Sequence, residues 1–126
     1  MILFVYGTLK QGERNNKLMQ GRFLREVRTE PKFRLVDFGT FPGLAFGRHA
    51  ISGELWEVDD ETLVKLDEFE GIGDGVYIRK LIQLEDGEQA YAYLCQPFFA
   101  VEYDGTNWHE RERQTVSQSL LSNAGN

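Results

Sequence analysis

The sequence has little of what builds disulfide frameworks, metal centres or covalent catalytic sites. Cys95 is the only cysteine, so no intramolecular disulfide can form, and its apolar neighbours predict a buried thiol. The two histidines, His49 and His109, have no cysteine or acidic residue at the spacing of a zinc site. Neither GxSxG nor a glycine-rich phosphate motif occurs. We therefore expect no bound metal and no serine- or cysteine-based nucleophile.

Positive charge and long apolar runs are also scarce. Fourteen Lys and Arg stand against twenty Asp and Glu, and the net charge of −6 disfavours a general nucleic-acid binder and docking on anionic lipid. A small anionic substrate remains compatible, because local geometry recognises it. No apolar run approaches the ~20 residues that span a bilayer, and the first residues lack the basic region of a signal peptide. The expected location is the cytoplasm.

Hydrophobic and aromatic residues, 41% and 13% of the chain, are present in the amounts that a packed core needs. The 126 residues suit one domain, which we place at residues 1–113, with the polar residues 114–126 as a frayed C-terminal tail. Alternation of apolar residues predicts strands at residues 2–6, 23–29, 32–37, 51–58, 76–84 and 89–95. Within residues 76–84, Ile78 and Ile82 are expected on one face and Tyr77 on the other.

Helices and turns are predicted between these strands. Residues 13–20 favour a short helix with Leu18 and Met19 turned inward, whereas three glycines and a proline favour an irregular loop at residues 38–47. An N-cap at Asp59 or Asp60, inward Leu63, Leu66 and Phe69, and a stop at Gly71 together predict a helix at residues 60–70. Because most strands follow one another through short turns, the predicted fold class is α+β. We expect a small, mostly antiparallel β-barrel flanked by short helices.

Two segments stand out as candidate functional sites. The first is Tyr6-Gly7-Thr8-Leu9-Lys10, where a glycine directly after a buried strand lets successive N–H groups face one way, as in anion-binding turns. An ordinary tight turn is the alternative interpretation.

The second segment, residues 66–71, places three acidic residues at the end of the predicted helix. Such residues usually form a solvated surface, and Arg79 could pair with Glu68 or Asp67. Glu70, however, lies at the helix C-terminus, where the helix dipole and the neighbouring acids should raise its pKa. A carboxyl group with a raised pKa suits proton transfer near neutral pH.

Taken together, these segments resemble the γ-glutamylcyclotransferase-like family. The resemblance rests on Tyr6-Gly7-Thr8-Leu9, Gly53-Glu54-Leu55-Trp56, Leu66-Asp67-Glu68-Phe69-Glu70-Gly71 and Tyr77-Ile78-Arg79, in this order across roughly residues 2–105. Tyr103-Asp104-Gly105 is similar to a late tyrosine-containing segment of the γ-glutamylamine cyclotransferase branch. That branch is therefore the expected one.

The resemblance implies a reaction and a set of site residues. In the family reaction, the α-amine of a γ-glutamyl group attacks its own γ-carbonyl, forming 5-oxoproline and expelling an amine without a cofactor. The resemblance implies that Glu70 is the catalytic acid/base and that the backbone of Gly7, Thr8 and Leu9 holds the substrate. Three tyrosines are candidates to line the pocket: Tyr6, Tyr77 and Tyr103.

Three functions remain open at this stage. The first is a cyclotransferase for γ-glutamylamines, such as γ-glutamyl-ε-lysine. The second is the same reaction on γ-glutamyl amino acids or another γ-glutamylated metabolite. The third is a domain that binds a small carboxylate without turnover. The oligomeric state is not indicated by the sequence.

Overall fold

The computed structural model describes residues 1–71, 77–95 and 101–108. The elements follow in the order β1 (Ile2–Val5), the 3₁₀ helix η1 (Asn16–Leu18), β2 (Gly21–Arg28), β3 (Phe33–Asp37), β4 (Pro42–Phe46), β5 (Ser52–Val58), α1 (Asp60–Phe69), β6 (Tyr77–Gln83), β7 (Gln89–Cys95) and β8 (Val101–Glu102). The expected tail at residues 114–126 lies outside the described residues.

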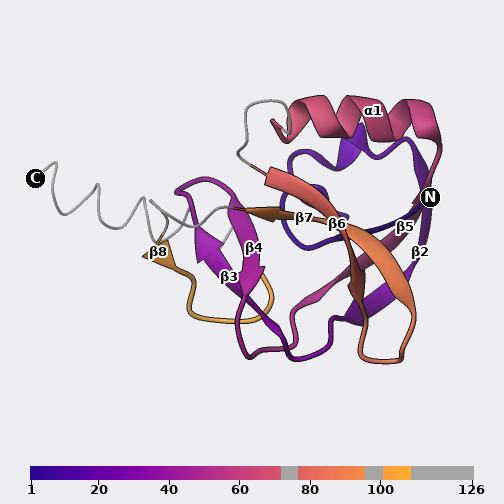
Figure 1. Cartoon of the computed structure of the whole chain (residues 1–126). Helices are drawn as coiled ribbons and strands as arrows, with labels where there is room; N and C mark the ends of the chain where they lie inside the picture. Colours follow the sequence, from indigo (N-terminus) through magenta and orange to yellow (C-terminus); the bar gives the residue numbers. More distant parts are fainter. Residues whose placement is uncertain (72–76, 96–100, 109–126) are drawn as a thin grey trace, which may run out of the picture.

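The strands form one curved, mostly antiparallel sheet. Its order is β2-β5-β1-β7-β4-β3-β8, and β6 pairs with the other edge of β7 (Figure 1). Parallel pairing joins β7 to β1 and to β4. The end of β2 also meets the end of β6, because the Glu30 N–H donates to the Gln83 carbonyl at 3.2 Å and the Glu85 N–H to the Arg28 carbonyl at 3.0 Å. The predicted α+β class is confirmed.

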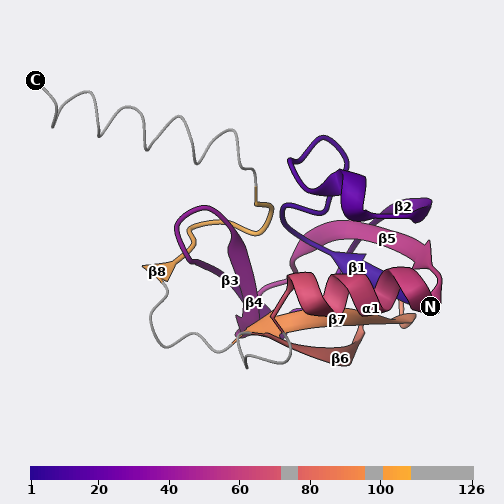
Figure 2. The same ribbon diagram turned by 90° about the horizontal axis from the view of Figure 1, so that it is seen from above.

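Two buried clusters lie on the two faces of the sheet, because successive residues of a strand point to opposite sides. Phe4 of β1 belongs to an inner cluster with Leu55, Ile82 and Trp108. Leu3 and Val5 belong to an outer cluster, which α1 covers with Leu63 and Leu66. Figure 2 shows α1 lying along the sheet, with β3, β4 and β8 grouped to one side.

The helix α1 forms largely as its sequence predicts. The Asp59 side chain accepts a hydrogen bond from the Thr62 N–H at 2.8 Å, and Gly71 ends the helix with φ +70°. One expectation is wrong: Phe69 is 49% exposed instead of buried. The outer cluster therefore includes Leu63 and Leu66 of this helix but not Phe69. The last turn of the helix leads into the pocket that is described below.

The segment 38–47 is only partly the predicted loop, because its residues 42–46 form β4, which pairs with β3 along its whole length and with β7 at Leu44. Its proline stands at the first strand position, where a missing N–H is tolerated. A side chain at Gly43 would lie 2.4 Å from Cys95 Sγ, so the glycine permits close packing. Cys95 itself is partly buried, less than expected.

Two further predictions need correction. Instead of a helix at residues 13–20, the structure has only the short η1, because Asn15 and Asn16 bond to Thr8 and Leu9 in place of a helical turn. Ile78 is 48% exposed, although Ile82 is buried as predicted.

Candidate active site

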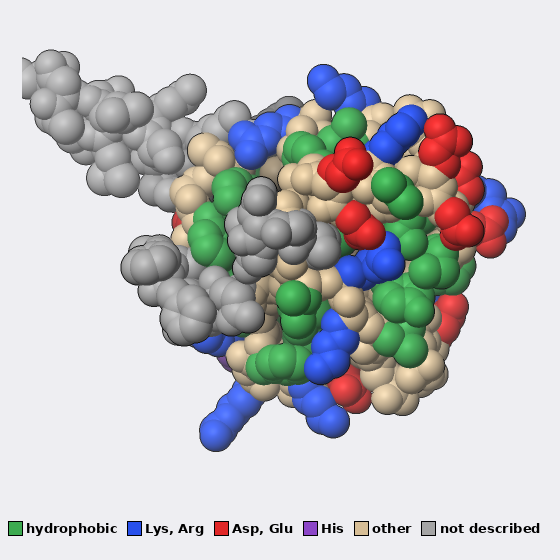
Figure 3. All heavy atoms as spheres, turned by 45° about the horizontal axis from the view of Figure 1, so that its top comes forward, with side chains coloured by type: hydrophobic (Ala, Val, Ile, Leu, Met, Phe, Trp, Pro, Cys, Tyr) green, Lys and Arg blue, Asp and Glu red, His purple; other side chains and the backbone are tan. Residues whose placement is uncertain are grey.

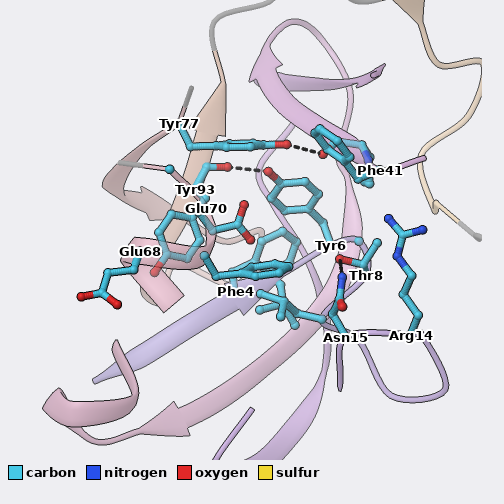
Figure 4. Close-up of a pocket in the computed structure, with 16 residues that line it drawn as sticks. Phe4, Tyr6, Thr8, Arg14, Asn15, Phe41, Glu68, Glu70, Tyr77 and Tyr93 are labelled. Atoms are coloured by element: carbon cyan, nitrogen blue, oxygen red, sulfur yellow. Dashed lines mark hydrogen bonds between the residues drawn. The ribbon is translucent and has the colours of Figure 1, made fainter. Parts of the chain in front are cut away.

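A pocket of about 340 Å³ lies where the turn after β1 meets the end of α1 and the start of β4 (Figure 4). This volume is typical of a small-molecule site. The lining residues are Phe4, Val5, Tyr6, Gly7, Thr8, Leu9, Arg14, Asn15, Phe41, Pro42, Glu68, Phe69, Glu70, Gly71, Tyr77 and Tyr93.

The pocket brings together six of the seven site residues expected from the sequence: Tyr6, Gly7, Thr8, Leu9, Glu70 and Tyr77. Tyr103 is the exception. It lines a different hollow, beside His49 and Thr106, and its ring packs against the inner cluster. The structure therefore does not bring Tyr103 to this pocket.

The turn at residues 7–9 is fixed through its carbonyl groups. The Gly7 carbonyl accepts from the Lys10 N–H at 3.1 Å, and the Thr8 carbonyl accepts from the Asn15 N–H at 2.9 Å. A trans peptide places a C=O and the next residue's N–H on opposite sides. The bound carbonyls of Gly7 and Thr8 therefore turn the N–H groups of Thr8 and Leu9 away from these partners.

The amide groups of this turn have no acceptor in the part of the chain that the structure describes. Gly7, Thr8 and Leu9 are all buried, yet the hydrogen bonds among described residues include none donated by their N–H groups. Buried backbone N–H groups are nearly always paired in folded proteins. Three successive ones beside a pocket can accordingly bind an anionic group of a ligand.

Glu70 lies directly after α1, and Figure 4 shows its carboxylate pointing toward the rings of Phe4 and Tyr6. Burial raises the pKa of this carboxyl group from 4.5 to about 7. No described residue forms a hydrogen bond or ion pair with the carboxylate. At neutral pH, Glu70 is thus divided between its protonated and ionised forms, which is the state that proton transfer needs.

The cause of the raised pKa differs from the one expected from the sequence. Asp67 accepts hydrogen bonds from Tyr93 Oη and Arg79 Nη1, both at 2.7 Å, so its charge is neutralised locally. Glu68 is exposed, and its carboxylate points away from Glu70 in Figure 4. Burial, rather than repulsion by these acids, therefore raises the pKa of Glu70.

This burial predicts a pH-dependent gain in stability for Glu70→Gln. The folded-state pKa of about 7 exceeds the ordinary 4.5, so the associated stability is full below pH 4.5 and is lost as the pH rises through 7. At pH 8 the variant should be more stable than the wild type by about 1–2 kcal/mol, after allowance for solvent screening. Near pH 4 the difference should vanish.

Urea denaturation at pH 4 and pH 8 measures this difference, and Glu68→Gln is the matched control, because Glu68 is exposed. A Glu70→Gln variant no more stable than the wild type at pH 8 would contradict burial of an ionised Glu70. The control should show no comparable pH-dependent difference.

Three tyrosine hydroxyl groups at the pocket are already used as donors within the protein. Tyr6 donates to the Tyr93 carbonyl at 2.6 Å, Tyr77 to the Pro42 carbonyl at 2.8 Å, and Tyr93 to Asp67. Burial raises the pKa of all three phenols, so they stay protonated at neutral pH. Their hydroxyl groups fix the walls of the described pocket, and Glu70 is the partly buried carboxyl group among its lining residues.

Sequence reasoning missed part of the wall. Phe41 and Tyr77 lie with ring centroids 6.5 Å apart, and Pro42 joins them beside the turn. Arg14, also missed, donates to the Thr40 carbonyl at 2.9 Å and supplies the guanidinium group of the described lining. The adjacent aromatic and proline at positions 41 and 42 were the available signal, but the predicted loop gave no reason to place them at the site.

The surface around the site is consistent with the acidic composition. The exposed face of α1 carries Asp60, Glu61 and Glu68, and Figure 3 shows acidic side chains gathered toward that end of the molecule.

Among the described residues, no group of three or more His, Cys, Asp or Glu is placed to hold a metal ion. None of the described helices has the length and apolar character needed to cross a membrane.

Comparison with known proteins places the chain in a family. Residues 3–117 match the family model described as "Gamma-glutamyl cyclotransferase, AIG2-like". A putative γ-glutamylcyclotransferase of Vibrio cholerae is 34% identical over 113 residues, which cover 87% of this chain and 96% of that protein. The γ-L-glutamyl-butirosin B γ-glutamyl cyclotransferase of Niallia circulans is 38% identical over 96 residues, covering 73% of this chain and 62% of that protein.

Solved structures agree with these sequence matches. The crystal structure of an AIG2-like protein from Mus musculus superposes with a TM-score of 0.67 at 30% identity, covering 86% of this chain and 85% of that one. The chain belongs to the AIG2-like γ-glutamyl cyclotransferase family.

Proposed function

We propose that this protein is a γ-glutamyl cyclotransferase that releases 5-oxoproline and a free amine from a γ-glutamylamine, with Glu70 as the general acid/base. The observation that carries the proposal is the partly buried Glu70 carboxyl, with its pKa near 7, in the same pocket as the amide groups of residues 7–9. Family membership supports the reaction class.

The proposed reaction assigns separate tasks to the turn and to Glu70. The N–H groups of Gly7, Thr8 and Leu9 bind the α-carboxylate, which orients the γ-glutamyl chain. The Glu70 carboxylate takes a proton from the α-ammonium group, and the freed amine attacks the γ-carbonyl carbon. The new C–N bond closes the five-membered ring, Glu70 returns the proton to the leaving nitrogen, and the bond to that nitrogen breaks. Glu70 then takes the second proton from the ring nitrogen, which leaves 5-oxoproline, and passes it to the departing amine.

This scheme balances without a co-reactant, since the nucleophile and the electrophile belong to one molecule. The tether supplies the proximity that a two-substrate enzyme must provide through binding. The pocket then needs to hold the folded conformer, move protons from the α-nitrogen to the leaving nitrogen and support the oxyanion with N–H donors. In the described pocket, the amide groups of residues 7–9 are proposed to hold the substrate and Glu70 to exchange the protons.

The leaving group is the finer part of the proposal. The name of the Niallia circulans relative gives γ-L-glutamyl-butirosin B as its substrate, which supports an amine larger than an α-amino acid. Arg14 at the edge of the pocket is the specific reason to test the second candidate, γ-glutamyl amino acids. A guanidinium group there suits a carboxylate on the leaving group.

The experiment measures 5-oxoproline released from γ-glutamyl-ε-lysine and from γ-glutamyl-alanine, by wild type and by Arg14→Gln. We expect release from both compounds and a higher kcat/KM for γ-glutamyl-ε-lysine. A preference for γ-glutamyl-alanine that is lost in Arg14→Gln would replace the amine by an amino acid as the leaving group. Binding of both compounds without release would favour the non-catalytic carboxylate-binding domain.

A further inference from the structure

Lys10, directly after the 7–9 turn, is a buried lysine outside the pocket. Its side chain and backbone together are only 6% exposed. Its ammonium group donates to Asn107 Oδ1 at 2.8 Å and to the Trp108 carbonyl at 2.7 Å. Burial lowers the pKa of Lys10, opposed by the nearby Glu13, Glu54 and Glu26. Because lysine is rarely buried without a paired charge or a structural task, this position needs an explanation.

The two acceptors of Lys10 belong to the far end of the described chain. Residues 106–108 run back to the sheet, where the Thr106 carbonyl accepts from the Ser52 N–H at 2.8 Å. Trp108 is fully buried in the inner cluster, which also contains Phe4 and Tyr6 from the pocket wall. Lys10 thus links the 7–9 turn to Trp108, a core residue in the same cluster as part of the pocket wall.

Trp108 also lacks a hydrogen bond that buried indoles usually have. Among the described residues, nothing accepts from its Nε1–H. Burying an N–H group without an acceptor costs free energy, which disfavours the buried position of the Trp108 side chain. The charge-assisted bond from Lys10 to the Trp108 carbonyl acts in the opposite direction and holds this residue in place.

Lys10 is fixed from its own side as well. Its N–H closes the turn on the Gly7 carbonyl, and the N–H of the next residue, Gln11, donates to Glu54 Oε1 at 2.9 Å. Glu54 in turn accepts from Trp56 Nε1 at 3.1 Å. The two residues directly after the turn, Lys10 and Gln11, are therefore hydrogen-bonded both to residues 107–108 and to β5.

We propose that Lys10 is a positioning residue that anchors residues 107–108 to the 7–9 turn and so keeps the amide groups of that turn in their substrate-binding orientation. This proposal rests on the proposed function, in which those amide groups bind the α-carboxylate. Lys10 does not line the pocket and takes no part in proton transfer. Its loss should consequently affect binding and leave the chemical step in place.

The test compares Lys10→Met with the wild type in steady-state kinetics on the better γ-glutamyl substrate. Methionine keeps the apolar stem and removes both hydrogen bonds. If the competent turn falls to about a tenth of the population, KM rises about tenfold. We expect kcat to stay within about twofold and the pH midpoint to be unchanged, because Glu70 is untouched. Lys17→Met, at an exposed lysine of η1, is the matched control and should change neither constant.

A second variant and a second readout keep the test decisive. Asn107→Ala removes one of the two acceptors and should raise KM about threefold, even if Lys10→Met fails to fold. In a Trp56→Phe background, the emission of Trp108 should shift to longer wavelength in Lys10→Met, which reports loss of the anchor without any turnover.

The outcomes separate this proposal from the proposed function. An unchanged KM in folded Lys10→Met, or a fall in kcat at constant KM, overturns the positioning role. No 5-oxoproline from the wild type on any substrate overturns the proposed function. In that case an unchanged Trp108 emission overturns the anchor as well, and a shifted emission supports it.

Discussion

Replacing Glu70 by glutamine is expected to lower the rate of 5-oxoproline release by about 10²–10⁴-fold, the usual contribution of general acid–base catalysis. Glutamine keeps the shape of the side chain and loses the ability to exchange a proton. The carboxyl group is suited to this task because burial raises its pKa to about 7, and because no described residue competes for it with a hydrogen bond. Initial rates at saturating substrate measure the loss.

The control for this variant is Glu68→Gln. Glu68 also lines the pocket, yet it is exposed and points away from Glu70, so its replacement should change the rate by less than about threefold. Comparable losses in both variants would point to the summed charge of the helix end instead of one proton carrier. Near-wild-type turnover by Glu70→Gln would show that another group transfers the proton.

The second large effect is expected from Gly7→Ala. An added Cβ would lie 2.6 Å from Cγ and 2.9 Å from Cδ of Pro42, closer than side-chain carbons approach each other. Either the turn or the start of β4 must shift, and both line the pocket. A displacement of this order at a substrate-positioning group lowers kcat/KM by about 10–100-fold.

A double variant distinguishes the steric cause from a general loss of flexibility. Pro42→Ala removes the Cγ and Cδ atoms that the new methyl group would meet. We expect Gly7→Ala/Pro42→Ala to recover most of the activity, and Pro42→Ala alone to show a small loss. If the double variant is as slow as Gly7→Ala, the contact with Pro42 is not the cause. Thermal denaturation of each variant separates lost activity from lost folding.

The parts of the fold that sequence patterns predict are those fixed by local rules. The helix α1 begins at the cap Asp59 and ends at Gly71, both of which act within one turn of chain. Between β6 and β7, the turn contains Asp86-Gly87, a pair of residues typical of hairpins, and Gly87 has φ +89°. The strand β4 was missed because its proline is tolerated only at the first strand position and its glycine reflects close packing against Cys95 of β7, which no local pattern shows.

The candidate site also has a part that could be predicted from the sequence and a part that could not. The residues of the 7–9 turn and Glu70 belong to short segments whose resemblance to a family can be recognised in the sequence. The structure brings these residues into one pocket. The cause of the raised pKa of Glu70 could not be seen, because burial by residues such as Phe4 and Tyr6 is a tertiary property. The anchor from Lys10 to Trp108 spans 98 positions, and no local pattern signals it.

The most direct test of this account is the pH dependence of 5-oxoproline release by the wild-type protein between pH 5 and 9. We predict that kcat/KM rises with pH and has a midpoint near 7, because Glu70 must be ionised to accept the proton of the α-ammonium group. This rising limb should be absent from the residual activity of Glu70→Gln. A profile that is flat down to pH 5, or a midpoint near 4.5, would contradict the role of Glu70 as a carboxyl group with a raised pKa.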